Sequence, residues 1–236
     1  MSEPIRLSKR LIEQVGCSRR EAELFIEGGW VSVDGVVIDE PQFKVTTQQV
    51  TLDPDAKASA PEPITLLLHH DPQLSIEQAL QSLGAQTLAQ EHSYGKRALK
   101  GHFLRLSCGA PLEAGASGLQ VFTQDWKILR KLTDDMAKIE QEYVVEVSGD
   151  MTEHGLNRLT HGATYKGRPL PAVKASWQNE TRLRFALKNP TPGLLGQLCA
   201  SVGLSVVSVR RIRIGGVSMG KLPMGQWRYM TAKEKF

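Results

Sequence analysis

The first part of the chain carries a compact pattern of two helices and a hairpin, over residues 7–38. Apolar side chains at every fourth position predict a helix over 7–15, and Gly16 is typical of the left-handed residue that ends a helix. Ser18-Arg-Arg-Glu21 is a capping box, in which the hydroxyl and the carboxylate each satisfy a free amide, so a second helix begins here. β-branched runs on both sides of Asp34-Gly35 predict a tight hairpin, because a type I′ turn needs positive φ at two successive residues. These signals specify a small helix–helix–hairpin module.

A polar, proline-rich stretch from Asp53 to Pro63 follows this module. Such a composition is typical of an exposed linker. We therefore expect a small domain over residues 1–52, a linker over 53–63 and a larger domain over 64–236. The chain has 236 residues, of which 41% are hydrophobic and 23% charged, which is the composition of a globular protein with room for both domains.

Cysteine use and hydropathy indicate a cytoplasmic protein without a membrane segment. The cysteines, Cys17, Cys108 and Cys199, are widely spaced and odd in number, which suits a reducing compartment. The N-terminus is charged and lacks the apolar core of a signal peptide, and no apolar run approaches the roughly 20 residues of a membrane span. We expect a monomer that needs no cofactor.

The larger part of the chain mixes strand patterns with helical ones, which predicts an α+β fold. The expected strands cover residues 64–68, 103–107, 119–123, 143–147, 172–177, 181–188, 204–214 and 227–231. The expected helices cover residues 76–83, 126–132, 152–159 and 192–202. His69 and His70 follow the first strand; because adjacent strand residues point to opposite faces, they are a poor pair for one metal ion, and we predict no metal site.

A loop rich in small residues, Gly109–Gly118, carries a single carboxylate, Glu113. Glycines allow a ligand or another backbone segment to approach closely because they have no Cβ atom. Two interpretations follow: an ordinary surface loop with one solvated glutamate, or an active-site loop with a reactive carboxylate. The local sequence favours the first interpretation, and the rest of the chain strengthens the second.

Basic residues gather at the starts of the two N-terminal helices: Lys9, Arg10, Arg19 and Arg20. The second pair also lies at a helix N-terminus, whose free amides favour phosphate. A solvated polar face is the usual explanation of such charges. Two basic pairs at matching places, opposite an apolar face, favour an anionic partner instead.

The last part of the chain, residues 181–233, contains basic residues but no Asp or Glu. The whole chain has a formal net charge of +4 at pH 7. Together with this charge, the acid-free span predicts a positive surface that binds a polyanion. An accidental basic patch is the alternative. The candidate phosphate contacts here are Arg210, Arg211 and Arg213.

The N-terminal module resembles an S4 RNA-binding domain. The resemblance runs from Arg6 to Gly35 and is carried by the strings Cys-Ser-Arg-Arg-Glu-Ala and Gly-Trp-Val-Ser-Val-Asp-Gly. It implies that structured RNA binds to the face formed by the two helices. Matched residue by residue, this face, which we call the S4 face, comprises Ser8, Lys9, Arg10, Ser18, Arg19 and Arg20.

The larger domain resembles the pseudouridine synthases of ribosomal RNA that carry an S4 domain in front. The string Gln141-Glu-Tyr-Val-Val-Glu-Val147 resembles the tyrosine-bearing strand of that family, and Val209–Arg228 resembles its C-terminal signature. The resemblance implies a mixed, mostly antiparallel sheet, an isomerase reaction on a flipped uridine, and ribosomal RNA as the partner. It implies that Tyr143 lines the catalytic pocket.

The catalytic strings differ from the family pattern. Pro111-Leu112-Glu113 stands where the family has Arg-Leu-Asp, so the resemblance puts Glu113 in the role of the catalytic Asp. Pro190–Gln197 has no basic residue where the family has several. Because a carboxylate displaced by about 1 Å can lose about 10²-fold in rate, these residues favour an RNA-binding protein without catalysis. An active isomerase that uses Glu113 and Tyr143 is the alternative.

Overall fold

The computed structural model of the chain describes residues 3–92 and 97–236. Its internal contacts divide the chain into two compact units. The first contains the described residues of 1–63 and 95–106, and the second contains the described residues of 64–94 and 107–236. Sequence analysis assigns everything after residue 63 to the larger domain, whereas the structure groups the described part of 95–106 with the smaller unit. None of the described helices is long and apolar enough to cross a membrane.

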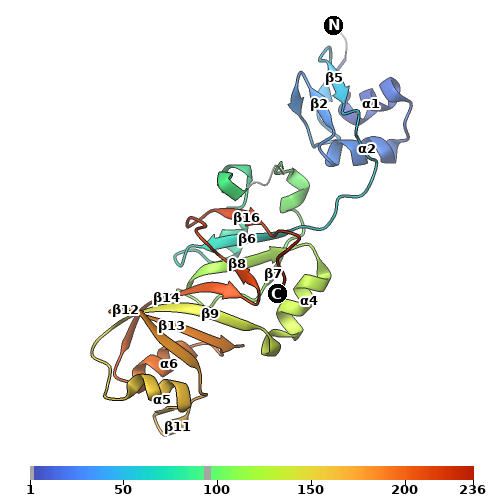
Figure 1. The fold of residues 1–236 in the computed structure, drawn as a ribbon. Helices are drawn as coiled ribbons and strands as arrows, with labels where there is room; N and C mark the ends of the chain where they lie inside the picture. The colour runs from blue at the N-terminus through green and yellow to red at the C-terminus, as the bar shows by residue number, and fades with distance from the viewer. Residues whose placement is uncertain (1–2, 93–96) are drawn as a thin grey trace. The chain divides into compact units, whose positions relative to one another are not determined.

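The first unit forms the expected helix–helix–hairpin of an S4 domain (Figure 1). Helix α1 (Leu7–Val15) ends at Gly16 with φ of 71°, and α2 (Arg19–Glu27) begins with the predicted capping box. The strands of this unit are β1 (Ile5–Arg6), β2 (Val31–Val33), β3 (Val36–Val37), β4 (Lys44–Val45) and β5 (Val50–Leu52). Asp34 and Gly35 turn the β2–β3 hairpin with φ of 48° and 80°, as a type I′ turn requires. The core of the unit consists of Leu7, Leu11, Ala22, Ile26, Val31, Val33, Val45 and Val50.

The expected strand over residues 103–107 is wrong. Residues Lys100–Phe103 form a 3₁₀ turn, and the strand begins only at Ser107. Polar contacts hold this turn, because the Lys100 ammonium lies 2.9 Å from the Glu40 carboxylate and its backbone N–H donates to Asp39. Arg105 then takes φ of 53°, which is incompatible with an extended strand.

The second unit has the expected α+β composition. Its helices are α3 (Ile76–Gln81), α4 (Trp126–Asp134), α5 (Gly155–His161) and α6 (Leu194–Ser201). Its strands are β6 (Thr65–His70), β7 (Ser107–Gly109), β8 (Ser117–Thr123), β9 (Glu140–Ser148), β10 (Thr164–Tyr165), β11 (Arg168–Pro169), β12 (Lys174–Asn179), β13 (Arg182–Lys188), β14 (Ser205–Ile214), β15 (Val217–Ser218) and β16 (Trp227–Tyr229). Short 3₁₀ turns cover Ala85–Thr87, Gln90–His92 and Met136–Lys138.

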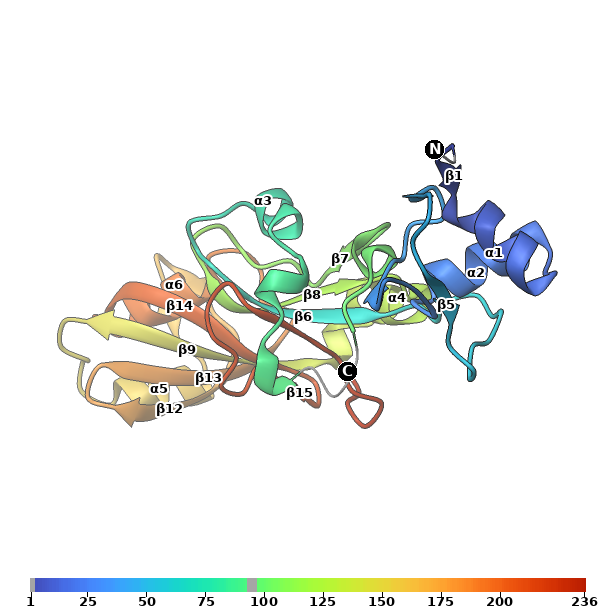
Figure 2. The same ribbon diagram turned by 90° about the horizontal axis from the view of Figure 1, so that it is seen from above.

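One mixed sheet forms the centre of this unit. Its strand order is β12-β13-β9-β14-β8-β6-β16, with β15 added to β14 and β7 added to β8 (Figures 1 and 2). The β14–β8 pair is parallel, with Arg211 beside Gly118, and the other pairs are antiparallel. The mixed, mostly antiparallel sheet is therefore confirmed.

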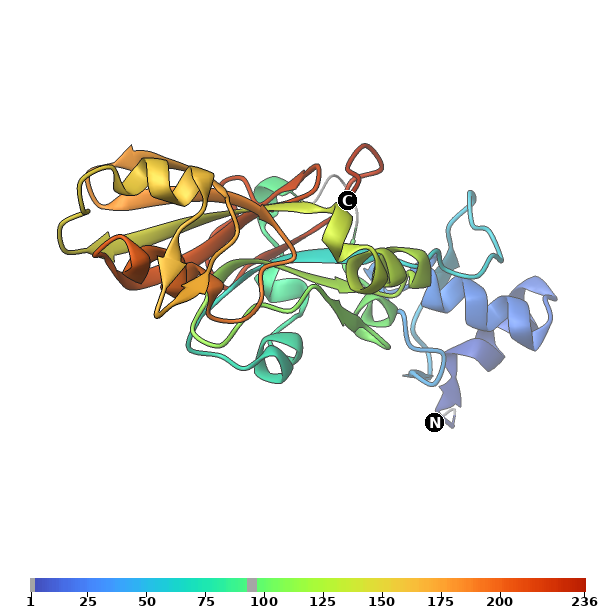
Figure 3. The ribbon, with the colours of Figure 1, turned by 90° about the horizontal axis from the view of Figure 1, so that it is seen from below.

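Two hydrophobic clusters pack on this sheet. In the first, α5 and α6 pack on β9, β13 and β14 through Leu159, Leu198 and Cys199. In the second, Leu132 of α4 and Met136 pack against β6, β8 and β14. Figure 3, seen from below, shows α4 and α5 in front of the strands. Of the two residues expected at the catalytic site, Glu113 lies on the loop between β7 and β8, and Tyr143 lies on strand β9.

Candidate functional site

The loop that carries Glu113 joins β7 to β8 and is held by a buried glutamine. The side-chain carbonyl of Gln120 accepts a hydrogen bond from the Leu112 N–H at 3.1 Å, and its NH₂ group donates to the Gly109 carbonyl at 3.0 Å. Gln120 is fully buried, so these bonds have no competition from water. The first half of the loop, from Gly109 to Leu112, is thereby fixed relative to β8.

The Glu113 side chain reaches the start of helix α6. Its carboxylate accepts a hydrogen bond from the backbone N–H of Gly193 at 2.8 Å. Gly193 is the residue that precedes the helix and has φ of 77°, a conformation that favours glycine. The free amides of a helix N-terminus favour a carboxylate. No described Arg, Lys or His forms an ion pair with Glu113, so a backbone amide stands where the family resemblance leads one to expect a cation.

Arg211 lies under this loop, with 2% of its surface exposed. Its Nε and Nη2 donate to the Leu119 carbonyl at 2.9 and 2.8 Å, and Nη2 also donates to the Ala110 carbonyl at 2.6 Å. Its Nη1 donates to the side-chain carbonyl of Gln141 at 3.1 Å, and the Tyr143 hydroxyl donates to the same oxygen at 2.9 Å. Arg211, Gln141 and Tyr143 therefore form one buried hydrogen-bonded group.

The electrostatics of this group connect Tyr143 to Glu113. Burial raises the pKa of the Tyr143 phenol above its usual value, the charge of Arg211 opposes this rise, and the charge of Glu113 adds to it. Burial lowers the pKa of the Arg211 guanidinium, but its usual value is so high that we take it as charged at neutral pH. The two residues expected at the catalytic site thus belong to one polar region of the second unit.

The three arginines proposed as phosphate contacts have different surroundings. Arg211 requires a correction, because its donors are directed to protein oxygens inside the domain and are not presented to a ligand. Arg213 is partly exposed and donates to the carboxylates of Glu140 at 2.8 Å and Glu142 at 2.6 Å. Arg210 is half-buried and forms no ion pair with a described carboxylate. Of the three, Arg210 is the most available to a phosphate.

Strand pairing also corrects the expectation of an uncompensated basic surface over residues 181–233. Strand β9 lies between β13 and β14 and supplies Glu140, Glu142 and Glu146 to both neighbours. Ion pairs join Arg182 to Glu146, Arg184 to Glu142, Arg213 to Glu140 and Glu142, and Arg228 to Glu234. The acids missing from this part of the sequence thus come mainly from a strand about 40 to 70 residues earlier along the chain.

The S4 face contains both structural and available groups. Ser18 is engaged in the capping box, where its hydroxyl accepts from the Glu21 N–H at 3.2 Å. Arg10 donates to the Thr46 carbonyl, and Arg19 to Glu23 at 3.0 Å. A hollow of about 450 Å³ between the helices is lined by Arg6, Ser8, Lys9, Ile12, Arg19, Glu23, Glu27, Pro41 and Gln42. Arg20 is exposed outside this hollow, so Lys9, Arg19 and Arg20 are the most accessible cations of the face.

His69 and His70 are both buried. His69 Nδ1 lies 2.7 Å from the Leu222 carbonyl, and burial lowers the pKa of both imidazoles, which favours the neutral form. Among residues 3–92 and 97–236, no three His, Cys, Asp or Glu side chains gather as a metal site would require.

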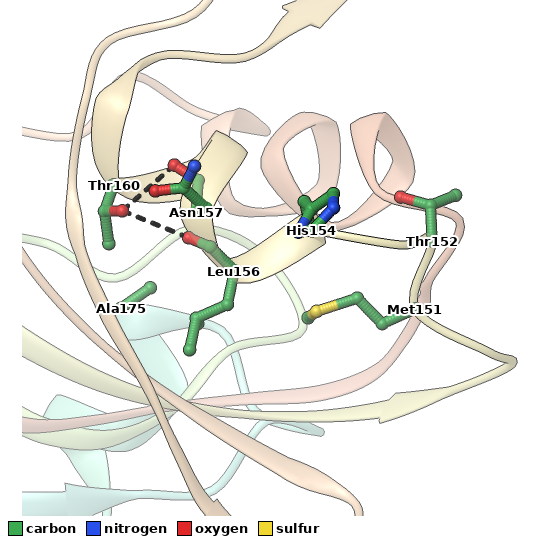
Figure 4. Close-up of a pocket in the computed structure, with 8 residues that line it drawn as sticks. Met151, Thr152, His154, Leu156, Asn157, Thr160 and Ala175 are labelled. Atoms are coloured by element: carbon green, nitrogen blue, oxygen red, sulfur yellow. Dashed lines mark hydrogen bonds between the residues drawn. The ribbon is translucent and has the colours of Figure 1, made fainter.

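A second hollow, of about 600 Å³, lies beside α5 (Figure 4). It is lined by residues such as Met151, His154 and Asn157, and the Thr160 hydroxyl donates to the Leu156 and Asn157 carbonyls beside it. Neither Glu113 nor Tyr143 lines it, so it is separate from the polar region described above.

Sequence reasoning missed three residues that shape the site: Gln120, Gln141 and Gly193. A glutamine within an otherwise apolar strand is a usable signal, because a buried amide has to find partners. This signal applies to Gln120, whose strand is otherwise apolar at its centre. The contact between Gly193 and Glu113 spans 80 residues and has no local signal.

Comparison with known proteins agrees with both resemblances. A family model described as the S4 domain matches residues 5–50. An uncharacterized RNA pseudouridine synthase of Aquifex aeolicus (strain VF5) is 25% identical over 235 residues, which cover 98% of this chain and 94% of the relative. The ribosomal large subunit pseudouridine synthase B of Yersinia pestis is 26% identical over 238 residues, which cover 97% of this chain and 73% of the relative.

Two further comparisons point the same way. The dual-specificity RNA pseudouridine synthase RluF of Escherichia coli (strain K12) is 24% identical over 235 residues, covering 98% of this chain and 77% of the relative. A crystal structure of a pseudouridylate synthase matches with a TM-score of 0.57 and 17% identity, covering 96% of both chains. At this identity the structural match shows the shared fold.

Proposed function

We propose that this chain, which belongs to the S4-domain-containing family of RNA pseudouridine synthases, binds structured RNA, and ribosomal RNA in particular, without isomerising it. The observation that carries the second half of this proposal is the surroundings of Glu113. Its carboxylate accepts from one backbone amide and forms no ion pair with a described cation. The buried Arg211 directs its donors to Ala110, Leu119 and Gln141 instead.

The chemistry of a flipped uridine would need more than this carboxylate. A reacting carboxylate has to be held within a fraction of an ångström of the base, and a charged partner is the usual means of orienting it. A glutamate is also one methylene longer than an aspartate. The single hydrogen bond from Gly193 fixes one oxygen and leaves the other free to move.

RNA binding is supported by the S4 domain and by the relatives. Two of the relatives are named for the ribosomal large subunit or for RNA, and both match nearly the full length of this chain. Lys9, Arg19 and Arg20 give the S4 face exposed or partly exposed cations next to a helix N-terminus. Phosphate is the ligand that such a surface favours.

One observation favours the second candidate function, an active pseudouridine synthase. Glu113 and Tyr143 still belong to the same polar region, and the Glu113 carboxylate meets the positive end of α6. An active enzyme would use that helix in place of the missing cations. This candidate predicts that Glu113→Gln abolishes pseudouridine formation while leaving RNA affinity nearly unchanged, because the substitution removes the charge and keeps the shape.

The RNA-binding half of the proposal is tested by salt dependence. Changing Arg19 and Arg20 together to alanine should weaken binding to a ribosomal RNA stem–loop and reduce the slope of log affinity against log salt by roughly 1 to 2, because each neutralised phosphate releases a counterion. Filter binding or fluorescence anisotropy across a salt series measures this slope.

The charge-matched control changes Arg182 and Arg184 to alanine. Both residues lie outside the S4 face, on β13 beside the glutamates of β9, so their removal should leave the slope close to that of the wild type if the S4 face supplies the contact. Equal slopes for the wild type and the Arg19/Arg20 variant would show that the S4 face does not contact the RNA phosphates.

A further inference from the structure

Trp126, the first residue of α4, leaves most of its indole in solvent, at 64% exposure. By contrast, Trp227 is fully buried, and Trp177 is 39% exposed. A single exposed apolar side chain is ordinary on a protein surface, so its surroundings decide whether it has a function. Those surroundings are charged, and the backbone that carries the indole is fixed.

The exposed side of α4 is basic around this indole. Lys127, Arg130 and Lys131 are all exposed, and together with Trp126 we call them the α4 surface. Arg130 lies one helical turn after Trp126, on the same side of the helix. It pairs with Asp134 at 3.5 Å, but both side chains are largely exposed, and such a pair is weak. Neither lysine of the α4 surface forms an ion pair with a described carboxylate.

The start of α4 is held firmly against the sheet. Asp125 caps the helix by accepting from the Lys127 N–H at 2.8 Å, and its own N–H donates to the Thr123 hydroxyl at 3.0 Å. That hydroxyl also lies 2.7 Å from the hydroxyl of Thr65 on the neighbouring strand. Trp126 is therefore presented from a fixed backbone, which lowers the entropy that a ligand would have to overcome in ordering it.

Two neighbouring strands also hold the backbone that leads into α4. Thr123 of β8 pairs with Thr65 of β6 and with Ser107 of β7. Trp126 follows Thr123 by three residues, and α4 lies beside β7 (Figure 1). The start of α4 is therefore anchored through Thr123 to two strands of the sheet.

We propose that the α4 surface is a stacking platform for an unpaired base of the RNA. The indole of Trp126 takes the base on its open face, and Lys127, Arg130 and Lys131 contact the adjoining phosphates. An exposed aromatic ring among cations is the arrangement that single-stranded and loop nucleotides favour, because every base offers a π face and every nucleotide a phosphate. This inference rests on the proposed RNA binding, and it adds a contact in the second unit that is separate from the S4 face and from Glu113.

The test compares two RNA probes with the full-length protein: a ribosomal RNA stem–loop with an unpaired loop, and a blunt duplex of equal charge. Trp126→Ala should weaken binding of the stem–loop about tenfold, because stacking on an aromatic ring accounts for about that factor per base. The duplex should lose less than threefold. Trp126→Phe should keep most of the affinity, and Trp177→Ala, the matched control on β12, should bind both probes as the wild type does.

Three results would overturn the inference. In the first, Trp126→Ala binds the stem–loop within threefold of the wild type, while the Arg19/Arg20 variant still reduces the salt slope. This result would show that the RNA binds but does not stack on Trp126. Equal losses for both probes together with a lower melting temperature would show that Trp126 contacts protein. Absence of RNA binding by the wild type would overturn the platform and the proposed function together.

Discussion

Arg211→Ala is expected to destabilise the second unit by roughly 4–6 kcal/mol, a large part of the ~5–15 kcal/mol that keeps a typical domain folded. The guanidinium is 2% exposed and bonds the carbonyls of Leu119 and Ala110 and the side chain of Gln141. Alanine would remove the guanidinium donors from the buried Leu119 and Ala110 carbonyls, would leave Gln141 with only the Tyr143 hydroxyl, and would add a cavity. Urea unfolding followed by circular dichroism measures the loss.

The adjacent residue provides the control for this prediction. Arg210 is half-buried and has no ion pair with a described carboxylate, so Arg210→Ala should change the free energy of unfolding by about 0.5 kcal/mol or less. The loss in the free energy of unfolding for Arg211→Lys should lie between the losses of the two alanine variants. Lysine keeps the charge but lacks the planar fork that reaches several acceptors. Similar midpoints for the two alanine variants would contradict the buried role of Arg211.

Gly118→Ala is expected to destabilise the same unit by about 3–5 kcal/mol, through backbone collision and not through lost bonds. A Cβ atom at Gly118 would lie 2.2 Å from the Arg211 carbonyl oxygen and 2.7 Å from its backbone nitrogen, on the neighbouring parallel strand. Its φ of 104° is also a conformation that alanine rarely adopts. The β8–β14 pair would have to separate, and thermal unfolding should show a much lower melting temperature.

Gly115→Ala is the matched control: it makes the same chemical change three residues earlier, in the β7–β8 loop. Gly115 has φ of 79°, but a Cβ atom there would meet nothing within 4 Å. Alanine at Gly115 should therefore cost only the conformational strain of about 1–2 kcal/mol. If both variants melt at the same temperature, the close approach of β8 to β14 is not the reason why position 118 requires glycine.

Local signals were sufficient to predict the first unit. The end of α1 at Gly16, the capping box at Ser18 and the Asp34-Gly35 turn each depend on residues within four positions of one another, and all are confirmed. The expected strand over residues 103–107 is wrong for the opposite reason. The turn of Lys100–Phe103 is held by Asp39 and Glu40, about 60 residues earlier, which no local pattern encodes.

The candidate site likewise combines residues that the sequence singles out with contacts that depend on distant parts of the chain. The sequence and the family resemblance were sufficient to single out Glu113 and Tyr143, and the polar region contains both. They could not show that Gly193 donates to Glu113, because this bond depends on how α6 meets the β7–β8 loop. They also overestimated the positive charge of residues 181–233, since a sum along the chain ignores the glutamates that β9 supplies to its neighbours.

The central claim is that the protein binds ribosomal RNA and leaves its uridines unchanged. The most direct measurement incubates the wild type with ribosomal RNA fragments that it binds, and maps pseudouridine in the recovered RNA. We expect binding without pseudouridine formation, for the wild type and equally for Glu113→Gln. Glu113→Asp should also be inert, because Pro111 and the arginine-free segment 191–197 still leave the carboxylate without a cation. Pseudouridine formed by the wild type and lost in Glu113→Gln would contradict the account and show that a glutamate held by the start of α6 is a competent catalytic group.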